Sequence, residues 1–379
     1  MSKLLKTLLV ALLSFSLVFT IAGCNNDDDG DTTQTGELVY KLITGDDGDQ
    51  YYAVTGYTVS SDDAVKMATG DFSSFTKAQR EITILETYNG KPVKEISAAA
   101  FADQVILKKV TVPASVETIG EGAFSGCTNL EELTLPFVGK KADAVNGERV
   151  LGYIFGASST GDGNVQITAK IQKEESEAAT TFYVPASLKT LTVTGSRVPE
   201  CAFYGLTMLQ NVSIPNATYI GAYAFYGCSL IYEINVASVV AIYDHAFELC
   251  TSLQKVAFGD TPSLEYVGDY AFAGCSRLGL NYASNDKALI TLTLPATVNY
   301  LGEYAFSDCV ELKYVDISST LITTIYGGTF SACESLQEVK VNANIEVKAG
   351  AFTESPKMDA SKLIGVDLTK IENGAFGTV

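Results

Sequence analysis

The sequence has little positive charge, because 26 lysines and arginines stand against 44 aspartates and glutamates and the formal net charge is −18. A chain with this charge repels phosphate backbones and anionic lipid headgroups. We therefore do not expect it to bind nucleic acid or to lie on a membrane surface. The negative charge argues against these two classes of partner, but it does not identify another class.

The sequence contains no tryptophan and a single histidine, His245. It has no nucleophile elbow, phosphate-binding loop or HExxH motif, and no CxxC pair or Cys/His cluster with zinc-ligand spacing. His245 stands two residues before a repeated phenylalanine. Sister repeats carry Tyr223, Tyr270 and Tyr304 at that position, so the histidine varies a repeat position. We predict no catalysis, no metal and no cofactor.

The first 24 residues are typical of an exported protein. Lys3 and Lys6 precede an apolar run too short for a comfortable membrane span, and the run ends in IAGC at Cys24. This ending resembles the bacterial lipobox, in which the cysteine is lipidated and the preceding peptide is removed. We predict a lipoprotein signal peptide at 1–23 and a lipid on Cys24. An ordinary secretory peptide and an uncleaved anchor are the alternatives.

Residues 24–36 connect the lipidated cysteine to the rest of the chain. Their sequence after Cys24, NNDDDGDTTQTG, is polar and acidic and has no apolar anchor, so it predicts a disordered tether. The tract also resembles the acidic signal that some Gram-negative bacteria use to send lipoproteins to the outer surface. The predicted location is the bacterial cell envelope, with the chain lipid-anchored on the outer surface and touching the membrane only through Cys24.

A repeated phenylalanine, usually in an Ala-Phe pair, marks most of the remaining chain. Where the spacing is undisturbed it is 22 to 25 residues, the period of a leucine-rich-repeat coil. Glycines such as Gly221 and Gly302 suit tight corners where a Cβ would crowd the neighbouring coil. The phenylalanines are predicted to stack from coil to coil in the core. They are Phe101, Phe124, Phe203, Phe225, Phe247, Phe272, Phe306, Phe330, Phe352 and Phe376.

Cysteines recur three residues after six of these phenylalanines. One cysteine per coil in one slot predicts a buried column of free thiols, since free cysteine behaves as a small hydrophobe. Disulfides or a metal are the alternatives. Leu206 fills the slot in one coil, which indicates a compact apolar side chain, and Cys201 is the one candidate for an exposed thiol. The column contains Cys127, Cys228, Cys250, Cys275, Cys309 and Cys333.

Apolar residues follow each cysteine slot at fixed offsets, and the last two of each set alternate, as in Leu133/Leu135 and Val315/Ile317. This alternation predicts one short strand per coil with its apolar side chains inward. Because a single unit cannot bury its own apolar face, the coils are expected to stack into a solenoid. Tyr219, Tyr266 and Tyr300, each six residues before a repeated phenylalanine, are expected to form a further stack.

The repeats "IGEGAFSGCTNLEELTLP", "VGDYAFAGCSRL" and "LGEYAFSDCVELKYVDIS" resemble those of the BspA-like leucine-rich-repeat family of bacterial surface proteins. The segments "LGYIFGASS" and "YVPASLKTLTVTG" resemble an irregular coil of that family. The resemblance covers 81–379. It implies a right-handed leucine-rich-repeat superhelix with a parallel β-sheet on its concave face and little helix. It also implies adhesion to host matrix proteins or host cells, and it brings no catalytic residues.

Residues 37–80 carry no repeat. Two strand-like halves around GDDGD indicate a β-hairpin, so we predict an N-terminal β cap over the first coil. Asp46, Asp47 and Asp49 in this turn are interpreted as turn residues rather than as a cation site. The repeats are interrupted by insertions near 139–149, 156–182 and 279–288, which are either recognition loops or tolerated drift.

The residues that point out of the predicted strands form the candidate binding face. This face is polar, with Tyr314 as its single aromatic ring. The alternative is that threonine and serine simply suit an exposed sheet. The candidate residues are Thr190, Thr192, Asn211, Ser213, Glu233, Asn235, Thr291, Thr293, Tyr314 and Asp316.

We therefore predict a non-catalytic cell-surface lipoprotein that mediates adhesion or protein–protein binding through a leucine-rich-repeat solenoid. The expected partner is a host or cell-surface protein, with a glycan as the second possibility. The alternatives are a glycan-binding subunit of a surface uptake system, which would require aromatic residues along a groove, and a structural envelope protein.

Overall fold

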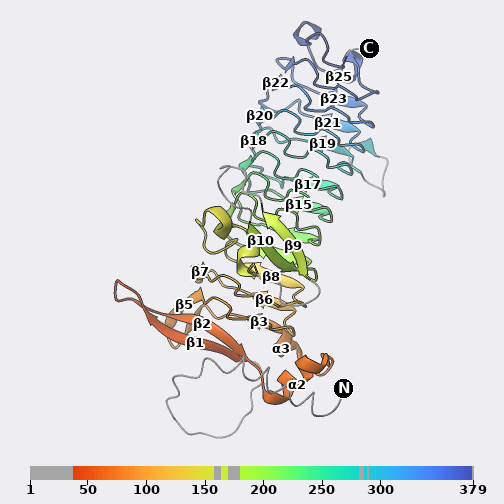
Figure 1. Ribbon diagram of the computed structural model, residues 1–379. Helices are drawn as coiled ribbons and strands as arrows, with labels where there is room; N and C mark the ends of the chain where they lie inside the picture. Colours follow the sequence, from red (N-terminus) through yellow and green to blue (C-terminus); the bar gives the residue numbers. More distant parts are fainter. Residues whose placement is uncertain (1–36, 158–163, 170–179, 281–285, 288–289, 378–379) are drawn as a thin grey trace.

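The computed structural model describes residues 37–157, 164–169, 180–280, 286–287 and 290–377. The chain winds through successive coils into one elongated stack, which runs from the N-terminal hairpin to the C-terminal coils (Figure 1). The predicted repeat solenoid with parallel strands and little helix is confirmed. Over the described ranges, no helix has the length and apolar character needed to cross a bilayer. The predicted signal peptide, Cys24 and the tether all lie outside the described residues.

The strands predicted from the alternating apolar residues form a parallel ladder, here called the first ladder. Its members pair in register, and the central residue of each three-residue strand is buried while its neighbours face outward. The ladder consists of three sheets, ordered β13-β11-β8-β6-β3, β15-β17 and β19-β21-β23-β25. The strands are β3 (Glu81–Thr83), β6 (Lys109–Thr111), β8 (Glu132–Leu135), β11 (Thr190–Val193), β13 (Asn211–Ser213), β15 (Glu233–Asn235), β17 (Lys255–Ala257), β19 (Thr291–Thr293), β21 (Tyr314–Asp316), β23 (Glu338–Lys340) and β25 (Leu363–Ile364).

A second parallel ladder runs along the opposite side of the stack (Figure 1). The sequence predicted only one sheet, so that prediction was incomplete. Apart from β5, its strands have two residues each, with the second residue buried. Two residues are too few to give an alternating pattern that sequence can reveal. The strands are β5 (Lys91–Ile96), β7 (Thr118–Ile119), β12 (Arg197–Val198), β14 (Tyr219–Ile220), β16 (Ala241–Ile242), β18 (Tyr266–Val267), β20 (Tyr300–Leu301), β22 (Thr324–Ile325) and β24 (Glu346–Val347).

The repeated phenylalanines form a column through the core between the two ladders. From Phe203 to Phe376, successive ring centroids lie 4.9 to 5.8 Å apart. A shorter column contains Phe101, Phe124 and Phe155, the last of these from the irregular coil. Within the described ranges no ring contact joins Phe155 to Phe203, and the second ladder is also interrupted there, between β7 and β12. The first ladder continues across this seam through the pairing of β8 with β11.

The predicted tight corners are confirmed by the space around the corner glycines. A Cβ on Gly302 would lie 2.5 Å from the backbone nitrogen of Asp269 in the preceding coil, and one on Gly221 would lie 2.4 Å from that of Glu200. Real Cβ atoms do not approach backbone so closely. The absence of a side chain at these corners lets consecutive coils stack at strand spacing.

The cysteine slot provides a hydrogen-bond donor as well as a small side chain. The Sγ of each of the six column cysteines donates to the carbonyl oxygen of the core phenylalanine one coil earlier, at 3.1 to 3.4 Å. Ser355 occupies the slot in the last complete coil and donates to Phe330 in the same way, at 2.7 Å. The interpretation of a purely apolar slot was therefore too narrow.

All seven described cysteines are free and buried. They include Cys201, which has an exposed fraction of only 2% and packs with Val150 and Phe182. The prediction that Cys201 is a candidate exposed thiol was wrong, because the irregular coil and the insertion cover it. Among the described residues, no group of three or more His, Cys, Asp or Glu side chains is placed to hold a metal ion.

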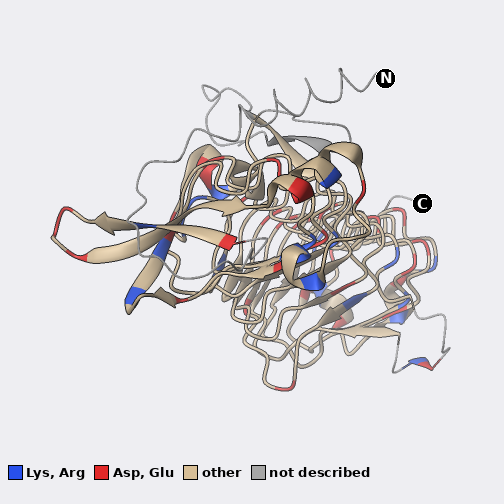
Figure 2. Cartoon of the chain, turned by 90° about the horizontal axis from the view of Figure 1, so that it is seen from below, with Lys and Arg blue, Asp and Glu red and all other residues tan. Residues whose placement is uncertain are grey.

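The N-terminal segment forms the predicted hairpin and extends the second ladder. β1 (Glu37–Thr44) pairs antiparallel with β2 (Gln50–Thr58), β2 pairs parallel with β5, and β4 (Thr87–Tyr88) pairs antiparallel with β5. Figure 2, which looks along the stack from this end, shows acidic residues at the hairpin tip. Two helices that the β-cap prediction did not include follow the hairpin, α2 (Ser61–Thr69) and α3 (Lys77–Arg80).

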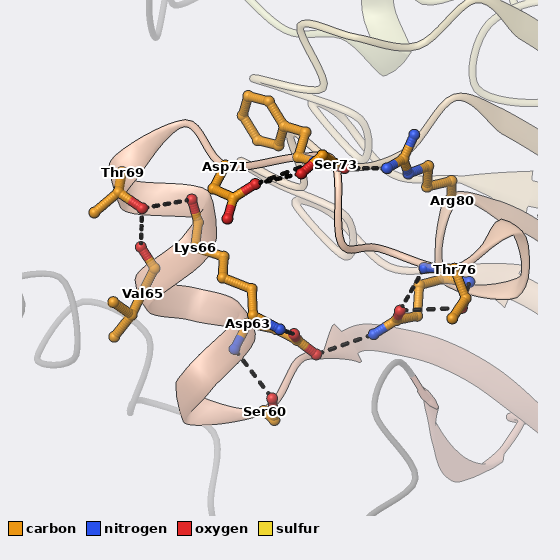
Figure 3. A network of polar contacts seen from close by, with 11 residues as sticks. Ser60, Asp63, Val65, Lys66, Thr69, Asp71, Ser73, Thr76 and Arg80 are labelled. Carbon is orange, nitrogen blue, oxygen red and sulfur yellow. Dashed lines mark hydrogen bonds and ion pairs between the residues drawn. The ribbon is translucent and has the colours of Figure 1, made fainter.

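A polar network joins α2 to α3 (Figure 3), and the hydroxyl group of Tyr57 in β2 donates to the carbonyl oxygen of Gln79 in α3 at 3.0 Å. Asp63, which is 5% exposed, accepts hydrogen bonds from Lys66 Nζ and Gln79 Nε2, both at 2.9 Å. The backbone N–H of Asp63 donates to the side chain of the N-cap residue Ser60 at 3.1 Å. Burial opposes the charged form of Asp63, but the hydrogen bonds from Lys66, Ser60 and Gln79 outweigh it and lower the pKa of the carboxyl group.

Replacing Asp63→Asn is expected to lower the free energy of unfolding at pH 7 by about 1–3 kcal/mol, because a charged acceptor of two hydrogen bonds is lost. Since the pKa of Asp63 is lower in the folded protein, its contribution is present above the unfolded-state pKa and is lost as pH falls through the folded value. The difference between wild type and variant should therefore shrink below about pH 4. Urea unfolding at several pH values measures it, and Asp62→Asn, on the exposed side of the same turn, is the control. A pH-independent difference would contradict the charged hydrogen bonds.

The insertions are only partly described. Residues 139–149 form turns that end in the 3-10 helix η1 (Asn146–Arg149), followed by η2 (Leu151–Ile154). In 156–182, β9 (Asn164–Ala169) pairs antiparallel with β10 (Thr180–Pro185), so this insertion contains a hairpin. In the insertion at 279–288, the Nζ of Lys287 pairs with Glu338 of β23 in the first ladder at 2.7 Å. The last coils contain the short 3-10 helices η4 (Ala360–Lys362) and η5 (Leu368–Lys370).

Candidate functional site

The ten predicted binding residues lie on the outward side of the first ladder, and we call them the strand face. Parallel register places Thr190 beside Asn211 and Thr192 beside Ser213. Further along the stack, Thr291 and Thr293 lie beside Tyr314 and Asp316. All ten side chains are exposed or half-exposed, so the face is open to solvent.

The charged and aromatic groups of the strand face are engaged with side chains of the same chain. Glu233 pairs with Lys255 at 2.7 Å, and Asp316 pairs with Lys340 at 3.5 Å. The Nζ of Lys287 lies 4.7 Å from the centroid of the Tyr314 ring. A partner that used these groups would first have to displace their present contacts, so the neutral central part of the face is the more accessible.

Aromatic residues gather on the outward side of the second ladder. Tyr219, Tyr266 and Tyr300 are the first residues of their strands, and Tyr243 and Tyr326 follow directly after β16 and β22. Neighbouring ring centroids lie 4.8 to 6.2 Å apart, and the guanidinium carbon of Arg197 lies 4.9 Å from the centroid of Tyr219. We call these residues the sheet row. It contains Arg197, Tyr219, Tyr243, Tyr266, Tyr300 and Tyr326.

A second aromatic row lies at the adjacent corner of the coils. Its four central rings, two residues before the core phenylalanines, stack at 4.4 to 4.9 Å. Their φ angles of 55 to 58° are left-handed, at a cost of roughly 1–2 kcal/mol for each such residue. Stacking of about 0.5–1.5 kcal/mol per ring pair offsets much of that cost. This corner row contains Tyr223, His245, Tyr270 and Tyr304, with Tyr204 and Tyr226 at its N-terminal end.

Carboxylates lie between the two rows. Asp244 Oδ1 accepts the backbone N–H of Asp269 at 3.0 Å, and Asp269 Oδ1 accepts that of Glu303 at 2.9 Å. Burial and then the negative charge of Asp269 raise the pKa of Tyr300 to about 12. Burial is the main cause of the raised pKa of Tyr270 in the corner row, followed by Tyr304 and Glu303, and Asp269 adds a smaller part. We call the two rows together with Asp244, Asp269 and Glu303 the tyrosine face.

The sequence predicted only part of this surface. The expected stack of Tyr219, Tyr266 and Tyr300 is incomplete, because the Tyr219 ring contacts Tyr243 and not Tyr266. Tyr243 and Tyr326 stand four residues before their core phenylalanines rather than six, so alignment on a single offset misses them. A search at both offsets would have found the sheet row.

Comparison with known proteins identifies the repeat. A family model described as the BspA type leucine rich repeat region matches residues 71–142, 178–289 and 281–379, in six copies. The chain belongs to the BspA-type leucine-rich-repeat family. The predicted resemblance to this family is confirmed.

Several solved structures are similar to this BspA-type protein. A leucine-rich repeat protein from Bacteroides ovatus is 19% identical, with 92% of this chain and 78% of that chain covered and a TM-score of 0.44. The T. pallidum leucine rich repeat protein is 20% identical, with 71% and 97% covered and a TM-score of 0.34. A leucine rich cell surface protein from Faecalibacterium prausnitzii is 17% identical, with 88% of each chain covered and a TM-score of 0.30. No curated protein sequence matches this chain significantly.

The unique histidine of this BspA-type protein is part of the corner row. His245 stacks between Tyr223 and Tyr270, with centroid distances of 4.4 and 4.9 Å, and its Nδ1 lies 2.5 Å from Glu248 Oε2. The interpretation of His245 as a variation on a repeat position agrees with this stacking. Its ring faces are occupied by tyrosines and its Nδ1 by Glu248, so only the part of its edge that carries Nε2 is left for contact.

One hollow of about 340 Å³ lies between the hairpin turn and the second ladder of this BspA-type protein, beside Asp46, Asp47 and Asp49. Lys94 and Glu117 line it and pair with each other at 3.0 Å. Asp47 Oδ1 accepts the backbone N–H of Asp49 at 3.1 Å, which is a bond of the turn itself. The arrangement fits the predicted polar turn, since a local lysine already supplies positive charge to the hollow.

Proposed function

We propose that this chain is a non-catalytic cell-surface lipoprotein that binds a protein partner along the outside of its solenoid. The supporting observation is the pair of in-register ladders, which carry rows of outward side chains along two faces of a continuous stack. Such surfaces suit an extended partner, because the side chains repeat at strand spacing and present many weak contacts in a fixed order.

The cell-surface assignment rests on the exported N-terminus and its lipobox-like end at Cys24. One solved structure with similar repeats is described as a cell surface protein, and the proposal extends that description to this chain. Lipid on Cys24 would tether the solenoid through residues 24–36. Metabolic labelling with palmitate tests this part: full-length protein should incorporate the label, and Cys24→Ala should abolish incorporation.

A glycan-binding subunit of an uptake system is the second candidate, because the structure contains exposed tyrosines outside the predicted strand face. Tyr243 has an exposed fraction of 45% and Tyr304 of 37%. Rings of this kind are the usual platform for sugars when their faces are open. The choice between a glycan and a protein partner therefore depends on whether the rings of the tyrosine face leave their faces open.

The test uses soluble protein that starts at Asn25, applied to arrays of matrix proteins and of glycans at about 0.15 M ionic strength, where non-specific attraction of basic proteins is screened. A saturable protein ligand is the expected result. Binding to glycans alone would move the protein to the uptake class. A blank array with folded protein would contradict the binding proposal and favour a structural envelope role.

A further inference from the structure

We propose that the tyrosine face binds an extended, arginine-rich segment of a protein partner. The inference rests on the proposed function, since it names a surface and a partner chemistry for protein binding. Three features of the face favour this partner: the geometry of its rings, its unpaired carboxylates, and the guanidinium of Arg197, which already lies on Tyr219.

The ring geometry disfavours sugars on the central part of the face. Tyr266 and Tyr300 stack at 4.8 Å with an interplanar angle of 5°, and Tyr270 and Tyr304 stack at 4.8 Å and 7°. Each of these rings covers a face of its neighbour, so the face presents edges and hydroxyl groups. A sugar that packs on an aromatic face finds few open ones, whereas hydroxyl groups and carboxylates are acceptors for a guanidinium.

The three carboxylates of the face have no basic partner among the described residues. Over the ranges that the structure describes, Asp244, Asp269 and Glu303 form no ion pair with a lysine or arginine. The sequence has no lysine or arginine from Val198 to Gln254. The charged residues Glu233 and Asp316 of the strand face are, by contrast, each paired with a lysine. The two faces therefore differ in what they offer a cationic partner.

Arg197 is an internal example of the proposed contact. Its guanidinium lies 4.9 Å from the centroid of Tyr219, and its Nε donates to the Tyr219 hydroxyl group. Guanidinium groups stack on aromatic rings and form directional hydrogen bonds, which an ammonium group does less well. Tyr243, the most exposed ring of the sheet row, meets its neighbours at tilts of 85° and 45° and leaves more of its face open than the stacked rings do. It is the next position at which an arginine could pack.

The experiment measures binding of a fluorescent dodecapeptide of alternating arginine and serine to soluble protein that starts at Asn25, at about 0.15 M ionic strength. The matched control peptide replaces each arginine with citrulline, which keeps the shape and removes the charge. A linear glucose hexasaccharide is the third probe. Saturable binding of the arginine peptide alone is expected.

Two double variants, each removing two negative charges, locate the binding. Asp269→Asn with Glu303→Gln changes the tyrosine face and keeps the Oδ1 acceptor of residue 269. Glu233→Gln with Asp316→Asn changes the strand face by the same charge. The first variant is expected to weaken peptide binding about tenfold and the second less than about twofold, since each exposed charge contact contributes little by itself. Tyr243→Ala is expected to weaken binding as well, and retained unfolding midpoints establish that the variants are folded.

Equal weakening by both double variants would overturn the inference, since attraction would then follow net charge alone. So would equal binding of the citrulline peptide, no peptide binding, or hexasaccharide binding that Tyr243→Ala abolishes. The proposed function has a separate outcome. If a protein partner from the array binds equally well to the Asp269→Asn, Glu303→Gln variant, the inference fails while protein binding stands.

Discussion

Replacing Phe247→Ala is expected to lower the free energy of unfolding by about 3–5 kcal/mol. Phe247 is fully buried and stacks between Phe225 at 4.9 Å and Phe272 at 5.2 Å. Truncation removes the apolar contacts of the ring and leaves a cavity that two rigid neighbouring rings cannot fill. Chemical denaturation monitored by circular dichroism measures the loss.

The matched control is Phe376→Ala, at the C-terminal end of the same column. Phe376 is only partly buried, and in the described part of the chain its one ring neighbour is Phe352, at 5.4 Å. Its replacement should cost clearly less than that of Phe247. An unchanged unfolding midpoint for Phe247→Ala, or equal losses at the two positions, would contradict the stacked core.

The thiols of the folded protein are expected to resist Ellman's reagent, with reaction slowed by a factor on the order of 10³ or more relative to the unfolded chain. Burial raises the pKa of Cys201 to about 11 and that of Cys333 to about 12, and the thiolate is the reactive form. Reaction must therefore wait for local or global opening. Protein that starts at Asn25 should release colour for seven thiols in denaturant and for almost none when folded.

An introduced surface cysteine provides the control for this measurement. Ala296 lies in an exposed turn before β20, so Ala296→Cys should react quickly and with one equivalent in the folded protein. Rapid reaction of one native thiol would indicate that Cys201 is open to solvent, as the sequence suggested, and would argue against its packing with Val150 and Phe182.

The regular features of the repeat could be predicted from the sequence, because the same residue types recur at the same position in successive coils. The apolar pairs Leu133/Leu135 and Val315/Ile317 alternate as inward strand residues do, and they lie in β8 and at β21 as expected. Gly302 stands at a corner where a Cβ would clash with the preceding coil, so a glycine at this repeat position predicts a tight corner in other coils as well. Periodicity turns a weak local signal into a strong one.

Features that depend on contacts between coils were predicted less well. The outward residues of the second ladder vary from Arg197 through Ala241 to Thr324, because backbone pairing there is indifferent to the side chain. The burial of Cys201 depends on Val150 and Phe182, which are distant in sequence. These contacts follow from the irregular coil, for which one sequence supplies no repeat to compare.

The helix α3 is a different case, because the sequence does contain a signal for its start. Thr76 and Gln79 form a capping box, with the Thr76 side chain accepting from the Gln79 N–H and Gln79 Oε1 accepting from the Thr76 N–H. The spacing of threonine and glutamine three residues apart predicts such a helix start. The β-rich pattern of the preceding hairpin led to a prediction of β structure for the whole of 37–80.

The seam at the irregular coil gives the stack a direction in which it bends most easily. On one side, β8 and β11 keep the backbone hydrogen bonds of the first ladder continuous. On the other side, the second ladder stops at β7 and resumes at β12, and the phenylalanine column is interrupted at the same level. On the second-ladder side the irregular coil joins the two parts by isolated contacts, such as the Leu151 N–H bond to the Ala202 carbonyl at 2.9 Å, rather than by paired strands, so we expect the stack to open more easily on that side. Arg197 and the tyrosine face begin on the C-terminal side of that seam, so such bending would change the position of the face relative to the N-terminal coils.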